Sequence, residues 1–391
     1  MKLVVIGLGQ CGGRIADEFA RLNRKAISQR GIEIITSTFA VNTDIADLSG
    51  LLRVRPDYQH RLLIGGRKTG GHGVGKINEL GAEVAREDAD KVLDAIRTTK
   101  HFAETDAFLL VAGAAGGTGS GSIAVLAQYL KERFIDKPVY TCVVLPFEHE
   151  EKTEERAVYN TATCLKSTYL VADAVILVDN QRYVKKESSI RSNLSNINTM
   201  IVEPFFNILC AGEEKKPKYI GSKLLDAGDI IQTLVGWTVL GYSRSHLSWF
   251  KRLFQTTQNF RKKATDTQKG VQAMDGAISR LSVHCKPADA KRALYLLSAP
   301  PKEMNVDLIK ELGGYLRGLA PEAVIRSGDY PREKDLIDVS VILSELSDVA
   351  KVRNYFTKTI SIIAAKRRRQ EGLQGDQAIL DGTFRDIPSL L

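Results

Sequence analysis

The sequence predicts an α/β protein whose first part is a doubly wound parallel sheet and whose second part is a smaller domain. Two observations lead to this prediction. Short apolar runs alternate with amphipathic helical patterns through the first 180 residues, which is the order of elements in a doubly wound fold. Three glycine-rich segments also follow strand-like runs or precede helical ones in this region. Since ligands of such folds bind where loops leave the carboxyl ends of the strands, we expect a ligand site at that edge of the sheet.

Length and composition are typical of a soluble protein with two domains. The chain has 391 residues, of which 43% are apolar, and this allows sizeable cores. Its most apolar stretch, residues 198–210, is interrupted by Glu203 and Pro204, and the chain opens directly on a strand. Neither a membrane span nor a signal peptide is therefore expected. Five scattered cysteines without a Cys-x-x-Cys pair favour a reducing cytoplasm and no metal site.

The basic excess does not by itself identify a partner. The formal net charge is +9, from 55 basic and 46 acidic residues, and part of the excess lies in Lys366–Arg369. Such a charge favours nucleic acid or an anionic membrane surface. No nucleic-acid motif accompanies it, so a solvated basic face is the commoner explanation and no specific nucleic-acid partner is expected.

The expected elements of the first 180 residues alternate between strands and helices. The strands are Leu3–Ile6, Glu33–Val41, Leu62–Ile64, Ala107–Val111, Val139–Leu145 and Ala174–Val178, and the helices are Arg14–Asn23, Ile77–Arg97, Ile123–Arg133 and Glu154–Leu170. Apolar periodicity of two or of 3.6 residues separates the two kinds of element.

The rest of the chain predicts a helical connection, a second domain and a tail. Residues 181–210 are mainly helical in pattern, and Cys210–Lys218 forms an exposed polar loop. In the second domain we expect helices at Asp229–Tyr242 and Met274–Leu281, a long loop at 255–273, and strands at Arg292–Ser298, Glu322–Ser327 and Leu336–Leu343. From Thr357 onward the pattern is a tail with a basic helix.

The run Val111–Ser122 is the most informative segment. It contains Ala115-Gly-Gly-Thr-Gly-Ser-Gly121 between an apolar strand and a helical pattern. Glycines let backbone N–H groups approach a phosphate closely, and the positive end of the helix macrodipole favours the anion. The segment therefore predicts a phosphate site rather than a flexible linker.

Two further glycine-rich segments support this site. Gly7-Leu-Gly-Gln-Cys-Gly12 follows the first strand and matches G-x-G-x-x-G, which alone indicates a dinucleotide, with Asp44 as the acidic residue after the second strand. Gly70-Gly-His-Gly-Val-Gly-Lys76 is close to a P-loop, but Ile77 stands where magnesium needs a hydroxyl, so only a supporting phosphate contact is expected. Three such loops converging on one edge indicate a polyphosphate ligand.

Together these motifs resemble the tubulin/FtsZ superfamily. Ala115–Gly121 is similar to its signature loop, Gly9–Gly12 to the first loop in its tubulin-like form, and Asn42–Asp44 to the second; Gly81-Ala-Glu83, Tyr159-Asn160 and Asp179-Asn180 fall at tubulin-like spacing. The combination most resembles the archaeal CetZ branch. The resemblance implies a Rossmann-like GTPase domain with a parallel sheet at 1–190, a long core helix at 191–212, a second α+β (activation) domain at 213–356 and a tail at 357–391.

The resemblance also implies which residues bind GTP or GDP, with Mg²⁺. Those expected at the nucleotide are Gly9, Gln10, Cys11, Gly12, Arg14, Asn42, Asp44, Gly70, Gly71, Gly116, Gly117, Thr118, Gly119, Ser120, Glu154, Arg156, Asn180 and Asn198. Among them Asn180 and Asn198 are implied to recognise guanine, since an amide both donates and accepts. Glu154 and Arg156 are implied at the ribose. Leu194 stands where relatives often have an aromatic ring, and Gly71 replaces a common asparagine.

Asp226 and Asp229 permit two interpretations. Two carboxylates three residues apart near a helix start are favourable N-terminal caps. The family resemblance instead implies an acidic loop that enters the nucleotide site of the next subunit and orients the water that attacks the γ-phosphate, so that hydrolysis follows head-to-tail assembly into filaments. In this interpretation Asp229 is the main residue and Asp226 its helper.

The tail and two alternative functions complete the expectations. Phe384–Leu391 resembles the short peptide with which FtsZ proteins engage membrane-anchoring adaptors, while a frayed terminus is the simpler interpretation. The leading hypothesis is a polymerising GTPase that controls cell shape or division. The alternatives are an NAD(P)- or FAD-dependent oxidoreductase and a filament protein that binds GTP but hardly hydrolyses it.

Overall fold

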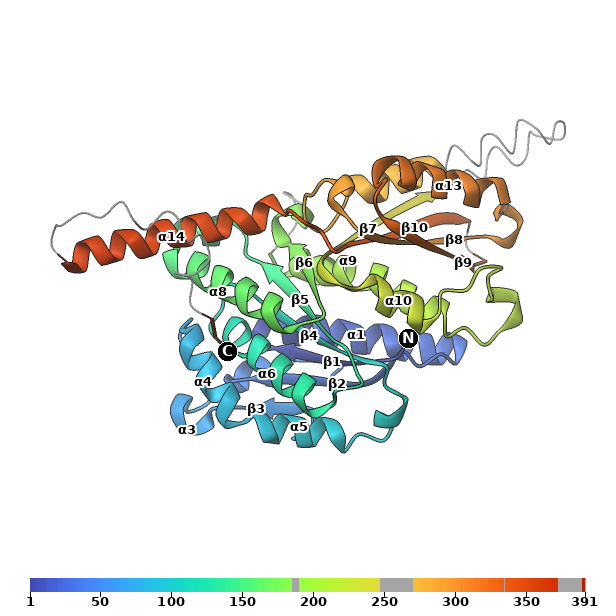
Figure 1. Cartoon of the computed structure of the whole chain (residues 1–391). Helices are drawn as coiled ribbons and strands as arrows, with labels where there is room; N and C mark the ends of the chain where they lie inside the picture. The colour runs from blue at the N-terminus through green and yellow to red at the C-terminus, as the bar shows by residue number, and fades with distance from the viewer. Residues whose placement is uncertain (185–189, 247–269, 305, 334, 372–388, 391) are drawn as a thin grey trace.

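One continuous sheet organises the molecule (Figure 1). The computed structural model describes residues 1–184, 190–246, 270–304, 306–333, 335–371 and 389–390. Within these ranges ten strands follow the order β3-β2-β1-β4-β5-β6-β7-β10-β8-β9. The first six in sequence are parallel, so their carboxyl ends meet at one edge.

All six strands expected in the first 180 residues are present. Their bounds are β1 Leu3–Leu8, β2 Ile35–Asn42, β3 Arg61–Leu63, β4 Ala107–Gly113, β5 Val139–Leu145 and β6 Ala174–Asp179. Strands β1, β4, β5 and β6 are almost entirely buried, which explains why they form continuous apolar runs rather than alternating ones.

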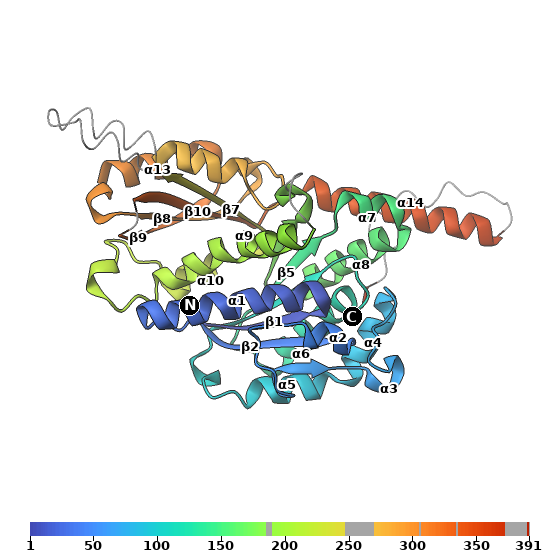
Figure 2. The same ribbon diagram turned by 180° about the vertical axis from the view of Figure 1, so that it is seen from behind.

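Helices cover both faces of this sheet (Figures 1 and 2). The helices of the N-terminal part are α1 Gly9–Arg30, α2 Ile45–Ser49, α3 Gly66–Thr69, α4 Asn78–Glu87, α5 Ala89–Arg97, α6 Thr118–Arg133, α7 Glu148–Thr153 and α8 Glu155–Val171. Apolar residues of α1 share one core with those of α9 (Ile190–Ala211), and α4, α5, α6 and α8 contribute to the core on the other face. Each face of the sheet therefore has its own apolar core.

The long helix expected at Ile77–Arg97 is two helices. Asp88 separates α4 from α5, with φ −102° and ψ 12°. Its side chain accepts a hydrogen bond from the N–H of Gly65 at 2.6 Å. A carboxylate drawn to a loop N–H competes with helix continuation, and the apolar periodicity on either side did not reveal the break.

The helix expected at Asp229–Tyr242 is wrong beyond its first turns. Helix α10 ends at Thr233, and β7 Gly236–His246 follows. Gly236 has φ 55°, a conformation that glycine adopts without strain. Strand β7 pairs parallel with β6 over its first three residues and antiparallel with β10 from Val239 on, so this one strand joins the two halves of the sheet.

The C-terminal part is a smaller α+β unit. Its strands are β8 Arg292–Ala299, β9 Val324–Pro331 and β10 Leu336–Ser344, each close to its expected position. Its helices are 270–279, α13 Val306–Leu319 and α14 Ala350–Glu371. The loop expected at 255–273 is helical from residue 270, and its earlier part lies outside the described residues.

The chain end packs against the N-terminal part. Helix α14 runs through the domain limit expected after residue 356, because its apolar side chains continue along α8. Leu390 is 5% exposed, its N–H donates to Ser167 Oγ at 2.8 Å, and its carbonyl accepts from Arg86. Among the described helices, none combines the length and the apolarity that crossing a bilayer requires.

Candidate functional site: a nucleotide cavity

A cavity of about 420 Å³ lies at the carboxyl ends of the parallel strands. Loops after β1, β2, β4, β5 and β6 line it, together with α9. Its lining residues are Leu8, Gly9, Gln10, Cys11, Arg14, Asn42, Asp44, Asp47, Gly73, Lys76, Gly113, Ala114, Ala115, Gly116, Gly117, Thr118, Gly119, Val144, Leu145, Pro146, Phe147, Glu150, Asn180 and Asn198. The position and size are those of a small-molecule site in an open α/β sheet.

Two helices begin at this cavity. Helix α1 starts at Gly9 and α6 at Thr118, and among the described residues no side chain caps either N-terminus. The first N–H groups of a helix have no partner within the helix and carry part of the positive end of its dipole. Two such ends facing one cavity form a site for a polyphosphate.

Glycine is required here by close packing. A Cβ on Gly12 would lie 2.0 Å from the carbonyl oxygen of Val111, and one on Gly121 would lie 2.1 Å from that of Asn78. At Gly117 it would meet the Val74 side chain at 2.5 Å. By contrast, nothing lies within 4 Å of a Cβ on Gly116. Gly12 and Gly121 therefore allow close contact between backbone segments, whereas Gly116 has free space around it and lines the cavity.

Asn160 holds two of the loops together. Its Nδ2 lies 2.9 Å from the carbonyl oxygen of Lys76, 3.0 Å from that of Ala115 and 3.1 Å from that of Gly116. The residue is fully buried, and its Oδ1 has no hydrogen-bond partner among the described residues. The sequence marked Asn160 only through its tubulin-like spacing and did not indicate that it anchors the phosphate loop.

The second loop adds carboxylates and a hydroxyl contact. Asp44 caps α2 by accepting from the N–H of Asp47 at 3.0 Å. Asp47 in turn accepts from Gln10 Nε2 at 2.7 Å and from Asn42 Nδ2 at 3.1 Å. Thr43 and Thr118 join this loop to the start of α6 through their hydroxyls, 2.6 Å apart. Sequence reasoning missed Asp47, although its position three residues after Asp44 places both carboxylates at the start of one short helix.

The charges at the cavity are of both signs. Arg14 and Lys76 are its cations, and Asp44, Asp47 and Glu150 are its carboxylates among the lining residues. Burial, with a further contribution from the Glu150 charge, raises the pKa of the Cys11 thiol to about 12. Cys11 therefore stays a neutral thiol at pH 7 and adds no negative charge beside a phosphate.

Twelve of the residues expected at the nucleotide line this cavity. They are Gly9, Gln10, Cys11, Arg14, Asn42, Asp44, Gly116, Gly117, Thr118, Gly119, Asn180 and Asn198. Gly12 and Ser120 do not line it but support it. Gly12 packs against the Val111 backbone, and the Ser120 hydroxyl donates a hydrogen bond to the Gly116 carbonyl. Gly70 and Gly71 do not line it, because the loop turns so that Gly73 and Lys76 do.

The two residues expected at the ribose do not reach the cavity. Glu154 forms an ion pair with Lys76, and Arg156 forms one with Glu79. Phe147 and Glu150, which precede them in the chain, line the cavity instead. Several carboxylates lie within two turns of this segment, and helical periodicity alone does not decide which of them faces a ligand.

The two residues that the resemblance implies in guanine recognition lie on two helical elements. Asn180 follows β6 directly, and Asn198 lies on the first half of α9. Both residues line the one cavity, as the guanine assignment requires. The side chain of Leu194 lies outside the described residues.

The Asp226/Asp229 pair lies at the opposite end of the molecule. Helix α10 (Ala227–Thr233) lies beside the N-terminus, away from the carboxyl edge of the sheet, in both views (Figures 1 and 2). Helix α9 connects the ends, because Asn198 lines the cavity and Gly212 packs against the Leu225 backbone. At 1.5 Å per residue these ends of α9 are about 20 Å apart.

Both carboxylates of the pair have partners within the chain. Asp226 caps α10 by accepting from the N–H of Asp229 at 2.7 Å. Asp229 forms an ion pair with Arg326, with 3.3 Å between Oδ1 and Nε. Of the two interpretations, capping is observed for Asp226, and neither aspartate lines the cavity of its own chain.

Two family profiles match consecutive parts of this chain. The first, described as tubulin/FtsZ family, GTPase domain, matches residues 2–186, and the second, tubulin-like CetZ, C-terminal domain, matches 187–361. The fold and the cavity define a nucleotide-binding cytoskeletal protein, and the chain belongs to the tubulin/FtsZ family. Within that family it is a tubulin-like GTPase of the CetZ branch, as the sequence motifs predicted.

Relatives and solved structures agree with this assignment. CetZ1 of Haloferax volcanii is 33% identical over 369 residues, which cover 90% of each chain. The structure of the GDP-bound CetZ1 monomer matches with a TM-score of 0.79 and 30% identity, over 93% of this chain and all of the other. The GTPγS-bound protofilament of CetZ2 from the same organism matches with a TM-score of 0.81 and 27% identity, over 94% of this chain and 100% of the other.

Proposed function

We propose that this GTPase binds GTP in the cavity described above, assembles head to tail and hydrolyses the nucleotide between successive subunits. One observation carries the proposal: the cavity and the Asp226/Asp229 pair lie at opposite ends of one chain. A head-to-tail contact brings such ends together, and it repeats into a filament when its rotation does not close. The protofilament of the related CetZ2 supports this arrangement. Such filaments serve the control of cell shape or division.

The assignment of groups to the nucleotide follows from chemistry. The helix N-termini at Gly9 and Thr118 receive the phosphates. Asn180 and Asn198 read guanine, whose edge presents both an acceptor and donors. The GDP-bound CetZ1 monomer supports a guanine nucleotide as ligand.

Magnesium fits this site as a partner of the phosphates. Asp44 and Asp47 are carboxylates on the cavity, and Mg²⁺ typically takes one or two carboxylates together with substrate phosphates and waters. Among the described residues no group of three or more acidic, His or Cys side chains could hold a metal by itself. When bound, the ion neutralises charge on the phosphates. Gln10 and Asn42 hold the Asp47 carboxylate in place.

Hydrolysis requires a water held in line with the γ-phosphate. Positioning and electrostatic stabilisation supply most of the effect in phosphoryl transfer. The carboxylates already at the cavity, Asp44 and Asp47, suit Mg²⁺, whereas a carboxylate delivered by the next subunit arrives at the γ-phosphate only on assembly. Asp229 is assigned to orient this water and Asp226 to assist, which couples turnover to polymerisation.

The test is Asp229→Ala. We expect the variant to retain GTP, to lose at least about a hundredfold in turnover and to form longer-lived filaments, because the acceptor for the water is missing. Phosphate release and light scattering measure the two effects. Arg326→Ala is the matched control, since it removes the same ion pair but keeps the carboxylate. Normal turnover in Asp229→Ala would remove this residue from the mechanism.

One observation favours the alternative of weak hydrolysis. Asp226 and Asp229 already have partners in the monomer, so assembly has to release or redirect them. Phosphate release measured against protein concentration separates the alternatives. Hydrolysis completed by a neighbour rises more steeply than linearly, whereas a filament protein that hardly hydrolyses GTP shows filaments with little phosphate.

The tail is assigned to binding a membrane-anchoring adaptor. The filament is expected to act in the cytoplasm. No specific nucleic acid is expected as a partner. All five cysteines are free, in keeping with a reducing compartment. Residues 372–388 lie outside the described residues, while Leu390 is buried against α8. An adaptor that binds the last residues therefore displaces this contact. Deletion of residues 370–391 should spare GTP hydrolysis and change the position of the filaments in cells.

A further inference from the structure

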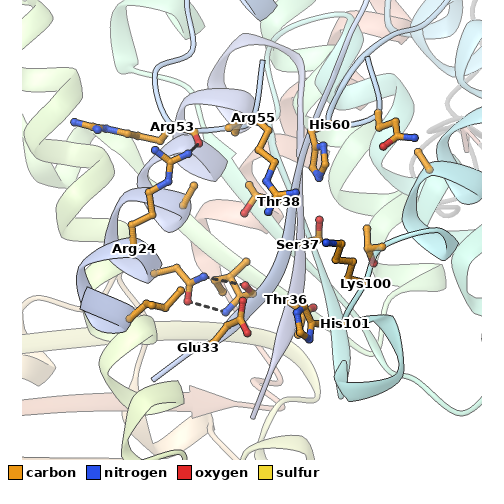
Figure 3. Close-up of a pocket in the computed structure, with 18 of the residues that line it drawn as sticks. Arg24, Glu33, Thr36, Ser37, Thr38, Arg53, Arg55, His60, Lys100 and His101 are labelled. Atoms are coloured by element: carbon orange, nitrogen blue, oxygen red, sulfur yellow. Dashed lines mark hydrogen bonds between the residues drawn. The ribbon is translucent and has the colours of Figure 1, made fainter. Parts of the chain in front are cut away.

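A second cavity, of about 350 Å³, lies over the edge of the sheet (Figure 3). Its floor is the first half of β2, and its walls come from α1, from the segment 53–60 and from the end of α5 with the turn that follows. It shares no lining residue with the nucleotide cavity. The groove is therefore a site separate from the nucleotide cavity.

The floor of the groove is an unpaired strand edge. Strand β3 pairs only with residues 40–42 of β2, so residues 35–39 have no strand partner on that side within the described chain. The N–H of Ala40 donates to the carbonyl of His60 on that side. Since successive residues of a strand alternate in direction, Thr38 also presents its N–H and C=O to the groove.

Cations stand on both sides of this edge. Arg24, Arg53, Arg55 and Lys100 line the groove, with Glu33 as its one carboxylate (Figure 3). Among the described residues none of these four cations has an ion-pair partner. Arg24 donates to the Arg53 carbonyl, and the other three side chains form no hydrogen bond within that part of the chain.

The segment that carries two of the arginines is held in place. Asp17 Oδ1 accepts from the N–H groups of Leu52, Arg53 and Val54. His60, at the other end of the segment, is bound to Asp57 with 2.7 Å between Nδ1 and Oδ1. His101, on the opposite wall, is engaged by Glu104. Asp17, Asp57 and Glu104 are thus occupied by the scaffold, and the arginines form no ion pair among the described residues, which leaves them available to a ligand.

We propose that the groove binds an extended acidic peptide segment of a partner protein, which adds to β2 as a further strand. A strand edge offers both donors and acceptors, and main-chain hydrogen bonds supply the affinity of this binding mode. A phosphate could use the donors only, and the carbonyl of Thr38 would repel it. Successive side chains of an added strand point to opposite walls, so glutamates at alternate positions all face one wall and can reach its arginines, and guanidinium groups bind carboxylates well.

The experiment is fluorescence anisotropy with the full chain loaded with GDP. The probe is a short labelled peptide of alternating glutamate and valine. The control probe has the same charge, with proline in place of valine, which removes every second backbone N–H and disfavours pairing as a strand. Arg53→Glu/Arg55→Glu reverses the charge of one wall, and Thr38→Pro removes a single N–H, a change that an edge strand tolerates. Arg133→Glu/Lys302→Glu is the matched charge control on other exposed surfaces.

We expect saturable binding of the glutamate–valine peptide at micromolar to millimolar concentration. Its affinity should fall about tenfold or more in Arg53→Glu/Arg55→Glu and in Thr38→Pro, and stay unchanged in the control variant. GTP hydrolysis should stay normal in all of these variants.

Several outcomes overturn the proposal. Equal binding of the proline peptide shows electrostatic attraction alone. If inorganic tripolyphosphate displaces the peptide and Thr38→Pro does not change peptide affinity, the groove is a site for small anions. No peptide binding, together with self-association of Arg53→Glu/Arg55→Glu, shows that the cations only protect the edge from pairing with other chains.

Discussion

The two ends of this subunit are built in different ways. At the nucleotide end, loops approach one another so closely that Gly12 and Gly121 have no room for a side chain. At the α10 end, Asp226 is an exposed cap and Asp229 pairs with Arg326 at the surface. The first end is complete as a binding site within one chain. The second is proposed to act only at the nucleotide of another copy.

This difference separates the groups expected to bind the nucleotide from those expected to promote its hydrolysis. The two helix N-termini that favour phosphate belong to one chain, so we expect the nucleotide end to bind its ligand before assembly. The carboxylates at the other end are ordinary surface groups until a neighbour places phosphates against them. If the proposed mechanism holds, the separation of Asp229 from the cavity by about 20 Å along α9 should keep turnover of the free subunit low.

The largest effect is expected from Gly12→Ala. The added Cβ would lie 2.0 Å from the Val111 carbonyl oxygen, so α1 has to move away from β4, at a cost of about 3 kcal/mol or more. We expect a markedly lower melting temperature and loss of bound nucleotide, measured by thermal unfolding and by the nucleotide content of the purified protein.

Gly116→Ala is the control for this prediction. Nothing lies within 4 Å of a Cβ at this position, so the variant should fold normally. Because Gly116 lines the cavity, only nucleotide affinity should change. If Gly12→Ala melted like the wild type, close packing would not explain the glycines of this end.

Sequence reasoning was strong at the nucleotide end for the same physical reason. Glycines at strand ends are costly unless the backbone needs them, so the glycines of Gly9–Gly12 and Gly116–Gly119 by themselves indicate loops that approach an anion. Apolar runs such as Val139–Leu145 likewise predicted β5 to the residue. Glycine positions and apolar runs depend only on residues close together in the sequence, so the sequence reveals them directly.

Features that depend on distant partners were missed. The amphipathic pattern around β7 was compatible with a helix, and only its pairing with β6 and β10 makes it a strand. Asn160 serves loops 45 and 84 residues away in sequence. The choice of Glu150 over Glu154 at the cavity depends on where α7 ends. None of these contacts leaves a periodic trace in the sequence.

The next effect tests whether the two ends meet in the filament. Asp229→Ala loaded with labelled GTP should release no labelled phosphate alone, but should release it when mixed with wild-type protein loaded with GDP. The wild-type neighbour supplies the carboxylate, which restores up to about a hundredfold in rate. An excess of unlabelled GTP suppresses transfer of the label to wild-type sites. Failure to rescue would place the catalytic carboxylate elsewhere.

A smaller effect is expected from Asn160→Ala. The side chain bonds to the carbonyls of Lys76, Ala115 and Gly116, and its loss removes the one group that joins all three, at a cost of about 1 kcal/mol. We expect about tenfold weaker GTP binding with the fold retained, measured by titration calorimetry. Thr161→Val is the control, because this neighbouring hydroxyl bonds only within its own helix. Equal affinities in both variants would show that Asn160 does not position the loops.

The smallest effect concerns α7, which lies between the nucleotide cavity and α14. Glu150 of α7 lines the cavity, while Glu151 beside it accepts from Tyr355 and binds Lys351 at 3.0 Å and Lys358 at 3.1 Å on α14. Burial raises the pKa of Glu151, but the hydrogen bonds from Tyr355, Lys351 and Lys358 outweigh it, so the net pKa lies below 4.5.

A carboxyl group whose pKa is lowered by folding stabilises the protein above its unfolded pKa and loses this contribution as pH falls through the folded value. The difference in unfolding free energy between wild type and Glu151→Gln should therefore be about 1 kcal/mol at pH 7, should begin to fall as the solution is acidified below the unfolded value of 4.5, and should vanish below the folded pKa. Urea denaturation at both pH values measures it. A difference that persists in acid would assign Glu151 a packing role instead. A parallel loss of GTP affinity at pH 7 would show that α14 and the cavity are coupled through the two adjacent glutamates of α7.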